Sequence, residues 1–336
     1  MRTRRTRGQA LLLTTMALVL TLAAGCGKTG TQAAAGPEKP DLNVAVVPAL
    51  DSAGFFVALY GGLFKAEGLN VSFTPAISSD TVIADQVKGT YDITGGNYVS
   101  YIQAQQSGQA NLDIFAEGSV MEPGTQGIYT MPDSKVKSLA DLKGKTVAIN
   151  APKNILYLLA ASMMAEQGLK PASVRFVDVP LPAMAAELAS GAIDAAVLPE
   201  PFASEAEETY GAVPLVDLDQ GATTGFPVAG YVVTKQWAAR YPRTLAAFYQ
   251  ALEEGERIAD NDRADVEQAM EDLPVKPVPL AVSKATAAVM TLDSYPVSSG
   301  PVGSVDLIRL ERVVNVMQQY LGFPKFNIKS MLINPR

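Results

Sequence analysis

The feature that most limits the fold is a regular alternation of short apolar runs and longer helix-forming segments between residues 41 and 234. Runs such as Leu42–Val47 and Lys145–Asn150 have the length and composition of buried strands. Segments such as Asn154–Gln167 are rich in helix-forming residues and end before a glycine. Strands that alternate with helices in this way predict sheets with helices on both faces, which is an α/β fold.

The pattern predicts nine strands and ten helices along the chain. The expected strands are Leu42–Val47, Val71–Thr74, Tyr91–Thr94, Leu112–Glu117, Gly127–Met131, Lys145–Asn150, Val174–Val179, Ala192–Leu198 and Gly230–Thr234. The expected helices are Ser52–Glu67, Ser79–Lys88, Tyr98–Ser107, Asn154–Gln167, Ala183–Ser190, Pro201–Tyr210, Pro242–Asn261, Arg263–Glu271, Ser283–Thr291 and Val305–Leu321.

Two short stretches occur twice, in the same order, once in each half of this pattern. Ala66–Leu69 resembles Ala165–Leu169, and Gly89–Ile93 resembles Gly191–Ala195. In each stretch a helix ends near a glycine and a strand begins shortly afterwards. The shared order predicts two related α/β lobes. The alternative is that any turn from helix to strand favours glycine, so that the matches indicate no relation.

The N-terminus has the pattern of an export signal. Four arginines precede residues 10–24, which carry no charge and are too few for an ordinary membrane-spanning helix. The run closes with Leu22-Ala23-Ala24-Gly25-Cys26, which resembles the lipoprotein box of bacteria, with its leucine one position earlier than usual. The resemblance implies a signal peptide over 1–25, a lipid on Cys26 and a flexible tether over 26–40. An ordinary cleaved signal and an anchor helix are the alternatives.

The composition argues against most enzymes. The chain has no histidine, and Cys26 is its only cysteine. An intrachain disulfide, a cysteine-based metal site and a Ser-His or Cys-His arrangement are therefore excluded. Cleavage before Cys26 would remove four arginines and no acid, taking the net charge from −7 to −11, which argues against nucleic-acid binding. We expect no catalytic residue, no metal and no cofactor.

Five segments together carry a family resemblance. They are Gly61–Leu69, Gly89–Asp92, Ser138–Val147, Gly191–Val197 and Glu200–Phe202. In this order and spacing they resemble the periplasmic substrate-binding proteins of nitrate, sulfonate, taurine and thiamine-precursor importers, which share the NMT1/THI5-like domain. The resemblance runs from about residue 41 to residue 322.

The resemblance implies a two-lobed, periplasmic binding protein-like α/β fold of type II, with two doubly wound sheets joined by two crossover strands. Gly127–Met131 and Gly230–Thr234 are the candidate crossovers. Lobe 1 would then comprise residues 41–127 and 234–336, and lobe 2 residues 128–233. Such proteins bind a solute between the lobes and deliver it to an ABC permease and its ATPase, and we expect a monomer.

Ligands of open α/β sheets lie at the carboxyl ends of the strands, near the N-termini of helices. In the first lobe this rule selects three loops. Their candidate ligand contacts are Asp51, Ser52, Phe55, Ser79, Asp80, Gly96, Asn97 and Tyr98. For Ser79 and Asp80 the alternative role is a helix cap, and for Tyr98 it is a core position.

In the second lobe the same rule selects Asn150, Lys153, Asn154, Tyr157, Glu200, Phe202 and Phe226. Lys153 is the one cation that the rule places in the cleft, and a solvated surface lysine is the alternative. The resembled family has Glu-Pro-aromatic at the cleft, which implies a ligand contact for Glu200. A carboxylate before a helix also stabilises the helix N-terminus, which is the alternative for this residue.

The candidate residues bear on the charge of the ligand. None of these loops contains arginine, and Asp80 and Glu200 would repel an anion. Aromatic, amide and carboxylate side chains favour a neutral or cationic molecule that carries a ring or an amine, such as a pyrimidine precursor of thiamine. Nitrate and sulfonates fit this set of side chains less well.

These observations favour an extracytoplasmic lipoprotein, attached to the cell membrane, that captures a small organic solute for an ABC importer. A ligand-sensing or adaptor lipoprotein is the second hypothesis. The third is an enzyme like the pyrimidine-precursor synthases, which the resemblance places on the same fold. Because those enzymes need histidine and a cysteine-rich motif, this hypothesis is disfavoured.

Overall fold

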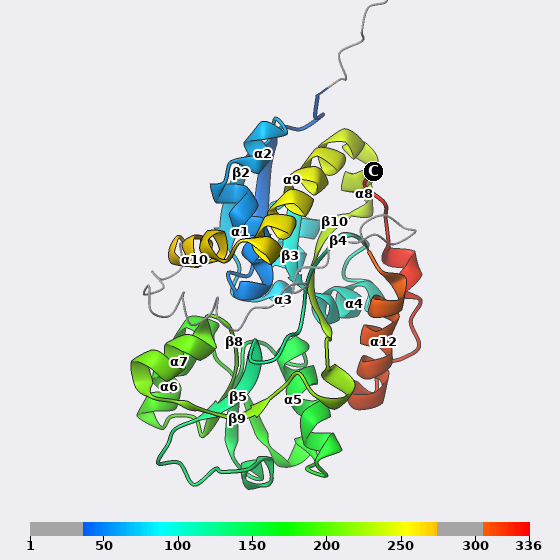
Figure 1. Cartoon of the computed structure of the whole chain (residues 1–336). Helices are drawn as coiled ribbons and strands as arrows, with labels where there is room; N and C mark the ends of the chain where they lie inside the picture. Colours follow the sequence, from blue (N-terminus) through cyan, green and yellow to red (C-terminus); the bar gives the residue numbers. More distant parts are fainter. Residues whose placement is uncertain (1–35, 274–304) are drawn as a thin grey trace, which may run out of the picture. The chain divides into compact units, whose positions relative to one another are not determined.

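The computed structural model describes residues 36–273 and 305–336, and they form two five-stranded sheets with helices packed around them (Figure 1). The first sheet has the order β2-β1-β3-β10-β4 and the second has the order β7-β6-β8-β5-β9. The strands are β1 Asp41–Val46, β2 Asn70–Pro75, β3 Ile93–Asn97, β4 Leu112–Val120, β5 Gln126–Thr130, β6 Thr146–Ile149, β7 Arg175–Asp178, β8 Ala195–Pro199, β9 Val213–Asp217 and β10 Pro227–Thr234.

The helices connect and cover these strands. The α-helices are α1 Ala53–Tyr60, α2 Leu63–Ala66, α3 Ser79–Val87, α4 Tyr98–Gln106, α5 Ile155–Glu166, α6 Leu181–Ser190, α7 Phe202–Tyr210, α8 Lys235–Arg240, α9 Pro242–Asn261, α10 Arg263–Glu271 and α12 Leu307–Leu321. Short 3₁₀ turns are η1 Leu50–Ser52, η2 Leu139–Leu142, η3 Pro171–Ser173, η4 Gly221–Thr223 and η5 Ile328–Met331. The helix predicted at Ser283–Thr291 lies outside the described residues.

Each sheet contains one strand that the chain forms directly after crossing over from the other lobe. β4 leads into β5, which lies between β8 and β9 and is antiparallel to both. β9 leads into β10, which lies between β3 and β4 and is antiparallel to both. The fourth position of each sheet is therefore filled in the same manner, as expected for two related lobes.

The predicted crossovers and lobe borders need correction. Gly127–Met131 and Gly230–Thr234 overlap β5 and β10, whose backbones are fully engaged in the two sheets. The connections between the lobes are instead residues 121–125 and 218–226. β10 belongs to the first lobe, because its hydrogen bonds join β3 and β4, so the prediction that lobe 2 extends to residue 233 is wrong.

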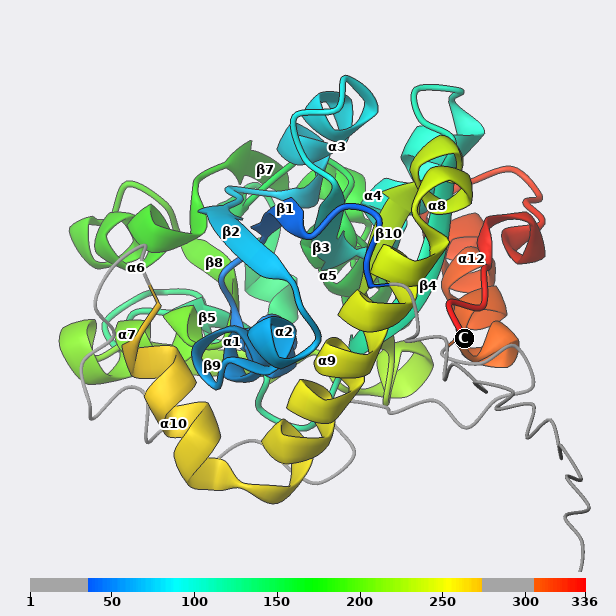
Figure 2. The same cartoon turned by 90° about the horizontal axis from the view of Figure 1, so that it is seen from above.

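Helices cover both faces of the first sheet because side chains alternate along its strands. Tyr231 and Val233 of β10 pack toward α1 and α9, whereas Val232 packs in the other core with residues of α4. The core between the first sheet and helices α1 and α9 holds a group of aromatic rings around Phe55. The ring centroids of Phe64 and Phe248 lie 5.5 and 6.5 Å from that of Phe55. Figure 2 shows α1 and α9 on one side of this sheet and α3 and α4 on the other.

The duplicated Gly-x-x-Asp stretches have the same structural role in both lobes. Asp92 Oδ2 accepts a hydrogen bond from the Asn43 backbone N–H (2.9 Å), and Asp194 Oδ2 accepts one from the Thr146 N–H (2.8 Å). Asp92 also pairs with Lys39, and Asp194 Oδ1 pairs with Lys145 Nζ at 3.1 Å. Each aspartate thus binds a backbone N–H group of a neighbouring strand, β1 in the first lobe and β6 in the second, which supports the relation between the lobes.

Residues 36–40 are attached to the first lobe, contrary to the predicted tether over 26–40. Glu38 accepts hydrogen bonds from the backbone N–H groups of Arg243 and Thr244, at the start of α9. Burial raises the pKa of Glu38. The backbone N–H donors and the Thr244 hydroxyl lower it by a larger amount, so the pKa lies below its ordinary value. The Glu38 carboxylate therefore caps α9 from a distant part of the chain, which a loose tether would not do.

Candidate functional site

A pocket lies where the carboxyl ends of β1, β3, β6 and β8 meet the first residues of β5 and β10. Its lining comprises Val47, Ala49, Asp51, Ser79, Gly96, Asn97, Gln126, Asn150, Ile155, Leu156, Leu181, Pro199 and Val228. Both lobes contribute to this lining. The cavity volume is about 30 Å³, room for one or two waters. A larger solute therefore requires the lobes to move apart before it enters.

The lobes touch directly on both sides of this pocket. The Leu50 N–H donates to the Glu200 carbonyl oxygen (2.9 Å), and Gln103 Nε2 donates to the Lys153 carbonyl oxygen (3.0 Å). Leu50 and Gln103 belong to the first lobe, whereas Glu200 and Lys153 belong to the second. The structure is thus the closed arrangement of the two lobes.

Ser79 and Asn97 form a rigid polar wall on the side of the first lobe. Ser79 Oγ accepts hydrogen bonds from the Asn97 N–H (2.9 Å) and from Asn97 Nδ2 (3.0 Å). Asn97 Oδ1 accepts from the Ser100 N–H (2.9 Å) and so caps α4. Gly96 lies against Ser79 so closely that an added Cβ would be 2.1 Å from Ser79 Oγ. A side chain at residue 96 would therefore displace this wall.

Asp51 is the only charged residue in the lining. Its Oδ1 is buried and accepts no hydrogen bond from any residue that the structure describes. Burial raises the pKa of Asp51 from its ordinary value near 3.8 to about 6, against a smaller lowering by its own backbone N–H. A buried acceptor of this kind is costly unless a donor satisfies it, and a ligand that donates hydrogen bonds can do so.

Gln126 and Asn150 supply the polar groups of the second lobe. Gln126 Oε1 is buried and, like Asp51 Oδ1, accepts no hydrogen bond within the described part of the chain. Asn150 Oδ1 accepts from Asn154 Nδ2 at 2.5 Å. The pocket therefore presents two unsatisfied acceptors, one from each lobe, and its lining contains neither lysine nor arginine. These side chains therefore offer hydrogen-bond acceptors and one carboxylate to whatever occupies the pocket.

Five of the fifteen predicted ligand contacts line the pocket, and they come from both lobes. They are Asp51, Ser79, Gly96, Asn97 and Asn150. Their convergence supports the rule that ligands lie at the carboxyl ends of strands. Whether these residues contact a ligand remains a prediction.

The predicted aromatic contacts are placed in the hydrophobic cores instead. Phe55 and Tyr98 are fully buried, and Tyr98 packs against Gly230 so closely that a Cβ there would meet the ring at 2.5 Å. Phe202 and Phe226 are also core residues, and Tyr157 packs on Phe176 at 4.8 Å. Burial of a large aromatic ring stabilises the fold by about 1.5–3 kcal/mol, and this drives these rings away from the pocket.

The remaining predicted polar contacts act on helix ends or lie outside the pocket. Ser52 precedes α1 and is buried without lining the pocket, and Asn154 Oδ1 caps α5 through the Tyr157 N–H. Asp80 Oδ2 accepts from Ser100 Oγ (3.0 Å). The side chain of Lys153 is exposed to solvent. The predicted cleft cation is therefore absent from the pocket lining.

Glu200 takes the alternative role that its position before a helix allowed. Its carboxylate accepts hydrogen bonds from the Ser204 N–H (3.1 Å) and Ser204 Oγ (2.9 Å) in the first turn of α7. The side chain is thus directed to the helix, while its neighbour Pro199 lines the pocket.

The prediction missed Gln126 and Val228 for a definite reason. Both lie at the beginning of strands, whereas the rule used for parallel sheets selects strand ends. Because β5 and β10 are antiparallel to their neighbours, their first residues lie at the edge where β8 and β3 end: Gln126 is opposite Pro199, and Ala229 is opposite Asn97. The sequence signal for Gln126 was a polar residue at the start of a strand that runs antiparallel to its neighbours.

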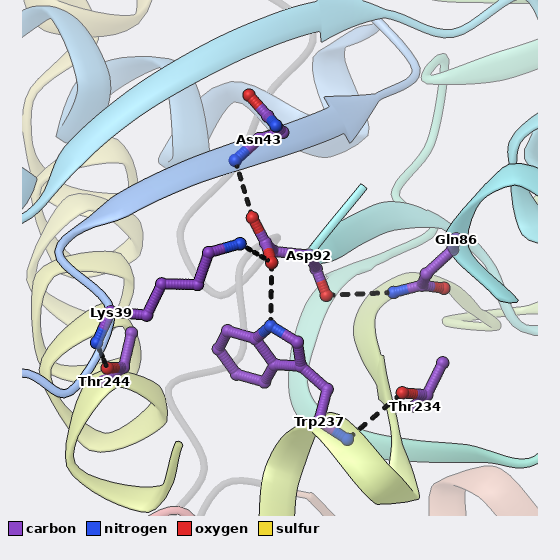
Figure 3. A network of polar contacts seen from close by, with 7 residues as sticks. All are labelled: Lys39, Asn43, Gln86, Asp92, Thr234, Trp237 and Thr244. Atoms are coloured by element: carbon purple, nitrogen blue, oxygen red, sulfur yellow. Dashed lines mark hydrogen bonds and ion pairs between the residues drawn. The ribbon is translucent and has the colours of Figure 1, made fainter. Parts of the chain in front are cut away.

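A larger groove of about 350 Å³ lies at the opposite end of the strands of the first sheet, near Lys39, Asp92 and Trp237. Figure 3 shows that the polar groups here bind one another. Asp92 Oδ1 accepts from Lys39 Nζ and from Trp237 Nε1 (2.8 Å), and Asp92 Oδ2 accepts from the Asn43 N–H. Because this carboxylate is satisfied internally and Asp194 has the same role in the other lobe, we assign the groove no ligand. The smaller interlobe pocket is the candidate site.

Within residues 36–273 and 305–336 no helix combines the length and apolarity required to cross a bilayer. The same ranges contain no group of three or more His, Cys, Asp and Glu side chains arranged to hold a metal ion.

Comparison with curated proteins finds a nitrate import ATP-binding protein, NrtC, and a bicarbonate transport ATP-binding protein, CmpC, both from Synechocystis. The chain is 25% identical to the first over 245 residues and 28% identical to the second over 247 residues. The matched segments span 68% and 67% of this chain but only 36% of each relative, about a third of its length.

Among solved structures, the chain resembles the alkanesulfonate-binding protein SsuA from Xanthomonas axonopodis pv. citri bound to MOPS. The TM-score is 0.74 at 19% identity, covering 90% of this chain and all of that one. It also resembles the periplasmic nitrate-binding protein NrtA from Synechocystis, with a TM-score of 0.65 at 16% identity over 74% and 70% of the two chains. These similarities confirm the predicted two-lobed periplasmic binding protein fold.

The model of the NMT1-like family matches residues 35–271, which include both sheets and every residue that lines the pocket. This match agrees with the resemblance that the five sequence segments indicated. The chain belongs to the NMT1-like family.

Proposed function

We propose that this protein is the solute-binding component of an ABC importer, and that it captures a small organic molecule between its two lobes. Its family and its two-lobed fold support this role. So do the structural neighbours, several of which are named as sulfonate-binding or nitrate-binding proteins, and one as the ligand-binding component of an ABC-type import system. We also propose that it is not an enzyme.

The observation that carries the proposal is the pair of buried acceptors, Asp51 Oδ1 and Gln126 Oε1, which approach the pocket from opposite lobes. A solute with two hydrogen-bond donors can satisfy both only when the lobes lie close to each other, and a molecule larger than one or two waters would hold them slightly farther apart than they are in this structure. Its binding energy would then favour the closed arrangement over the open one, which is the requirement for a ligand to shift such an equilibrium. Capture and closure are thereby one event.

The same pair indicates the chemical class of the solute. Because the lining offers a carboxylate, amides and apolar side chains without a cation, we propose a neutral or positively charged molecule with N–H donors. An amino-substituted heterocycle or a small amine fits this description. Nitrate, bicarbonate and sulfonates would lie beside Asp51 without a compensating charge, so we expect them to bind poorly.

The proposed location follows from the N-terminal sequence. The basic stretch, the apolar run and the box that ends at Cys26 support export and attachment of a lipid to that cysteine. The protein would then work as a monomer at the outer face of the cell membrane, beside a permease and its ATPase.

A thermal-shift screen on the mature chain tests the proposal. The panel contains aminopyrimidines, hydroxymethylpyrimidine derivatives, thiamine and polyamines, together with nitrate, bicarbonate, taurine and alkanesulfonates. A ligand at 100 times its Kd stabilises the folded state by about 2.7 kcal/mol, which raises the Tm measurably. We expect a shift with compounds of the first group. A shift with the anions alone would overturn the proposed ligand class and leave the receptor role intact.

Two variants locate the binding site of any compound that gives a shift. Gln126→Leu removes one acceptor at nearly constant volume, and calorimetric titration should show weaker binding. Gln268→Leu is the matched control, since Gln268 is an exposed glutamine of α10 that binds Asp272 and lies outside the pocket lining. Equal affinity of the wild type and Gln126→Leu would place the ligand elsewhere.

A further inference from the structure

Helix α12 connects the two lobes from the side. Its N-terminal end is fastened to the first lobe, because Glu117 of β4 accepts a hydrogen bond from the Asp306 N–H (2.5 Å) and forms an ion pair with Arg309 at 3.2 Å. Near its other end, Tyr320 Oη donates to Glu166 Oε1 (2.9 Å) at the end of α5 in the second lobe. In Figure 1, α12 runs beside both α4 and α5.

Arg312, in the second turn of α12, binds the connection between β9 and β10. Its Nη2 donates to the carbonyl oxygens of Ala222 (2.9 Å) and Thr224 (2.6 Å), and its Nη1 donates to that of Gly225 (3.2 Å). Its guanidinium also lies 5.7 Å from the centre of the Phe226 ring. Three carbonyl groups and one ring of a single connection are thus held by one planar cation, a fork geometry that lysine cannot reproduce.

This connection is where the two lobes must turn relative to each other. The Met121 N–H donates to the Phe226 carbonyl oxygen (2.8 Å), which joins the two interlobe connections. Gly225 has a φ of 54°, in the left-handed region that other residues rarely adopt. Two residues beyond Phe226, Val228 lines the pocket. A change at Arg312 can therefore reach the pocket without touching a ligand.

We propose that Arg312 is a positioning residue that holds the interlobe connection in its closed geometry and so sets how much of the ligand-free protein is closed. Opening the lobes changes the backbone angles of residues 218–226, and the three carbonyl groups can then no longer all face one guanidinium. Since only the closed form offers both acceptors of the pocket, the apparent Kd for a solute varies inversely with the closed fraction. The link to affinity rests on the proposed receptor function, whereas the effect on closure does not.

Distance measurement between spin labels tests the proposal without any ligand. Cys26 is replaced by serine, and labelled cysteines are introduced at Lys65 on the first lobe and at Ala189 on the second, both of which are exposed. Removal of one charge-assisted hydrogen-bonding group changes an equilibrium by about tenfold. For Arg312→Ala we therefore expect the ratio of the long-distance to the short-distance population to rise about tenfold, with a smaller rise for Arg312→Lys.

Arg257→Ala is the control, because Arg257 is an exposed arginine of α9 that pairs only with Glu254 among the described residues. Its distance distribution should match that of the wild type. If Arg312→Ala unfolds, Arg312→Lys keeps the positive charge but cannot hold all three carbonyl groups, and it should still raise the long-distance population. Distributions identical to the wild type in the folded Arg312 variants would overturn the proposal, and a lowered Tm without a distance change would assign Arg312 to fold stability alone.

Discussion

Replacement of Asp51 by asparagine should make the ligand-free protein more stable at neutral pH. Burial raises the pKa of this carboxyl from 3.8 to about 6 in the folded state, so the folded protein binds the proton more tightly than the unfolded chain does. The wild type therefore loses stability as the pH rises from about 4 to about 6 and does not regain it at higher pH. The asparagine side chain carries no charge at any of these pH values, so the variant escapes this loss.

The magnitude follows from the pKa shift. A shift of about two pH units corresponds to about 3 kcal/mol, an upper figure because part of Asp51 still reaches solvent. For a protein of this size we expect a Tm up to about 6 °C higher than that of the wild type at pH 8, and no difference below about pH 4. Binding of a cationic solute should weaken in the same variant, so stability and function would change in opposite directions.

The assay is thermal unfolding followed by circular dichroism between pH 4 and pH 8, for the wild type and the variant. Asp178→Asn is the control, since Asp178 is an exposed carboxylate at the end of β7. The difference in Tm between the Asp51 variant and the wild type should grow with pH, and the control should show no such trend. An Asp51 variant that is equally or less stable at pH 8 would refute the view that an unsatisfied charge is stored in the pocket.

Four further substitutions test other parts of the structure. Gly96→Ala should destabilise the fold by about 1–3 kcal/mol, because its Cβ would overlap Ser79 Oγ, and an unchanged urea midpoint would contradict this packing. Asp92→Ala and Asp194→Ala should each lower the free energy of unfolding by about 1–3 kcal/mol, measured in urea. The loss should be larger for Asp92, because this carboxylate also binds Trp237. Equal losses would argue against that extra contact. Glu38→Ala should cost about 1 kcal/mol and speed cleavage by endoproteinase Asp-N before the exposed Asp41, and an unaltered cleavage rate would mean that this segment is held by other contacts.

The sequence predicts the alternation of elements well because strand and helix periods are local properties. Exceptions arise where local signals conflict. The single helix expected over Ser52–Glu67 is interrupted after Tyr60, because Gly62 adopts a φ of 73° and starts α2 anew. β9 was missed because Pro214 lies inside a five-residue run, and proline usually argues against a strand. This strand tolerates it at the edge of the second sheet, beside β5 alone.

Pocket residues were harder to predict than strands, because a side chain near the site has several competing uses. Asn154 and Glu200 lie in the correct loops, yet each binds the first turn of the helix that follows. Phe55 follows the correct strand, yet the aromatic core takes it. The loops could be located from sequence, but the direction of each side chain depends on contacts with residues distant in the chain, such as the one between Gly230 and Tyr98.

The exchange of strands between the lobes has a consequence for biogenesis. The second sheet is built entirely from residues 126–217, whereas the first must wait for β10, more than a hundred residues after β4. A chain that emerges N-terminus first therefore exposes the unpaired edges of β3 and β4 while the whole second lobe is made. We expect the second lobe to mature first and the first lobe to close last, so that a chain truncated before residue 227 would be prone to aggregation and a natural client for chaperones.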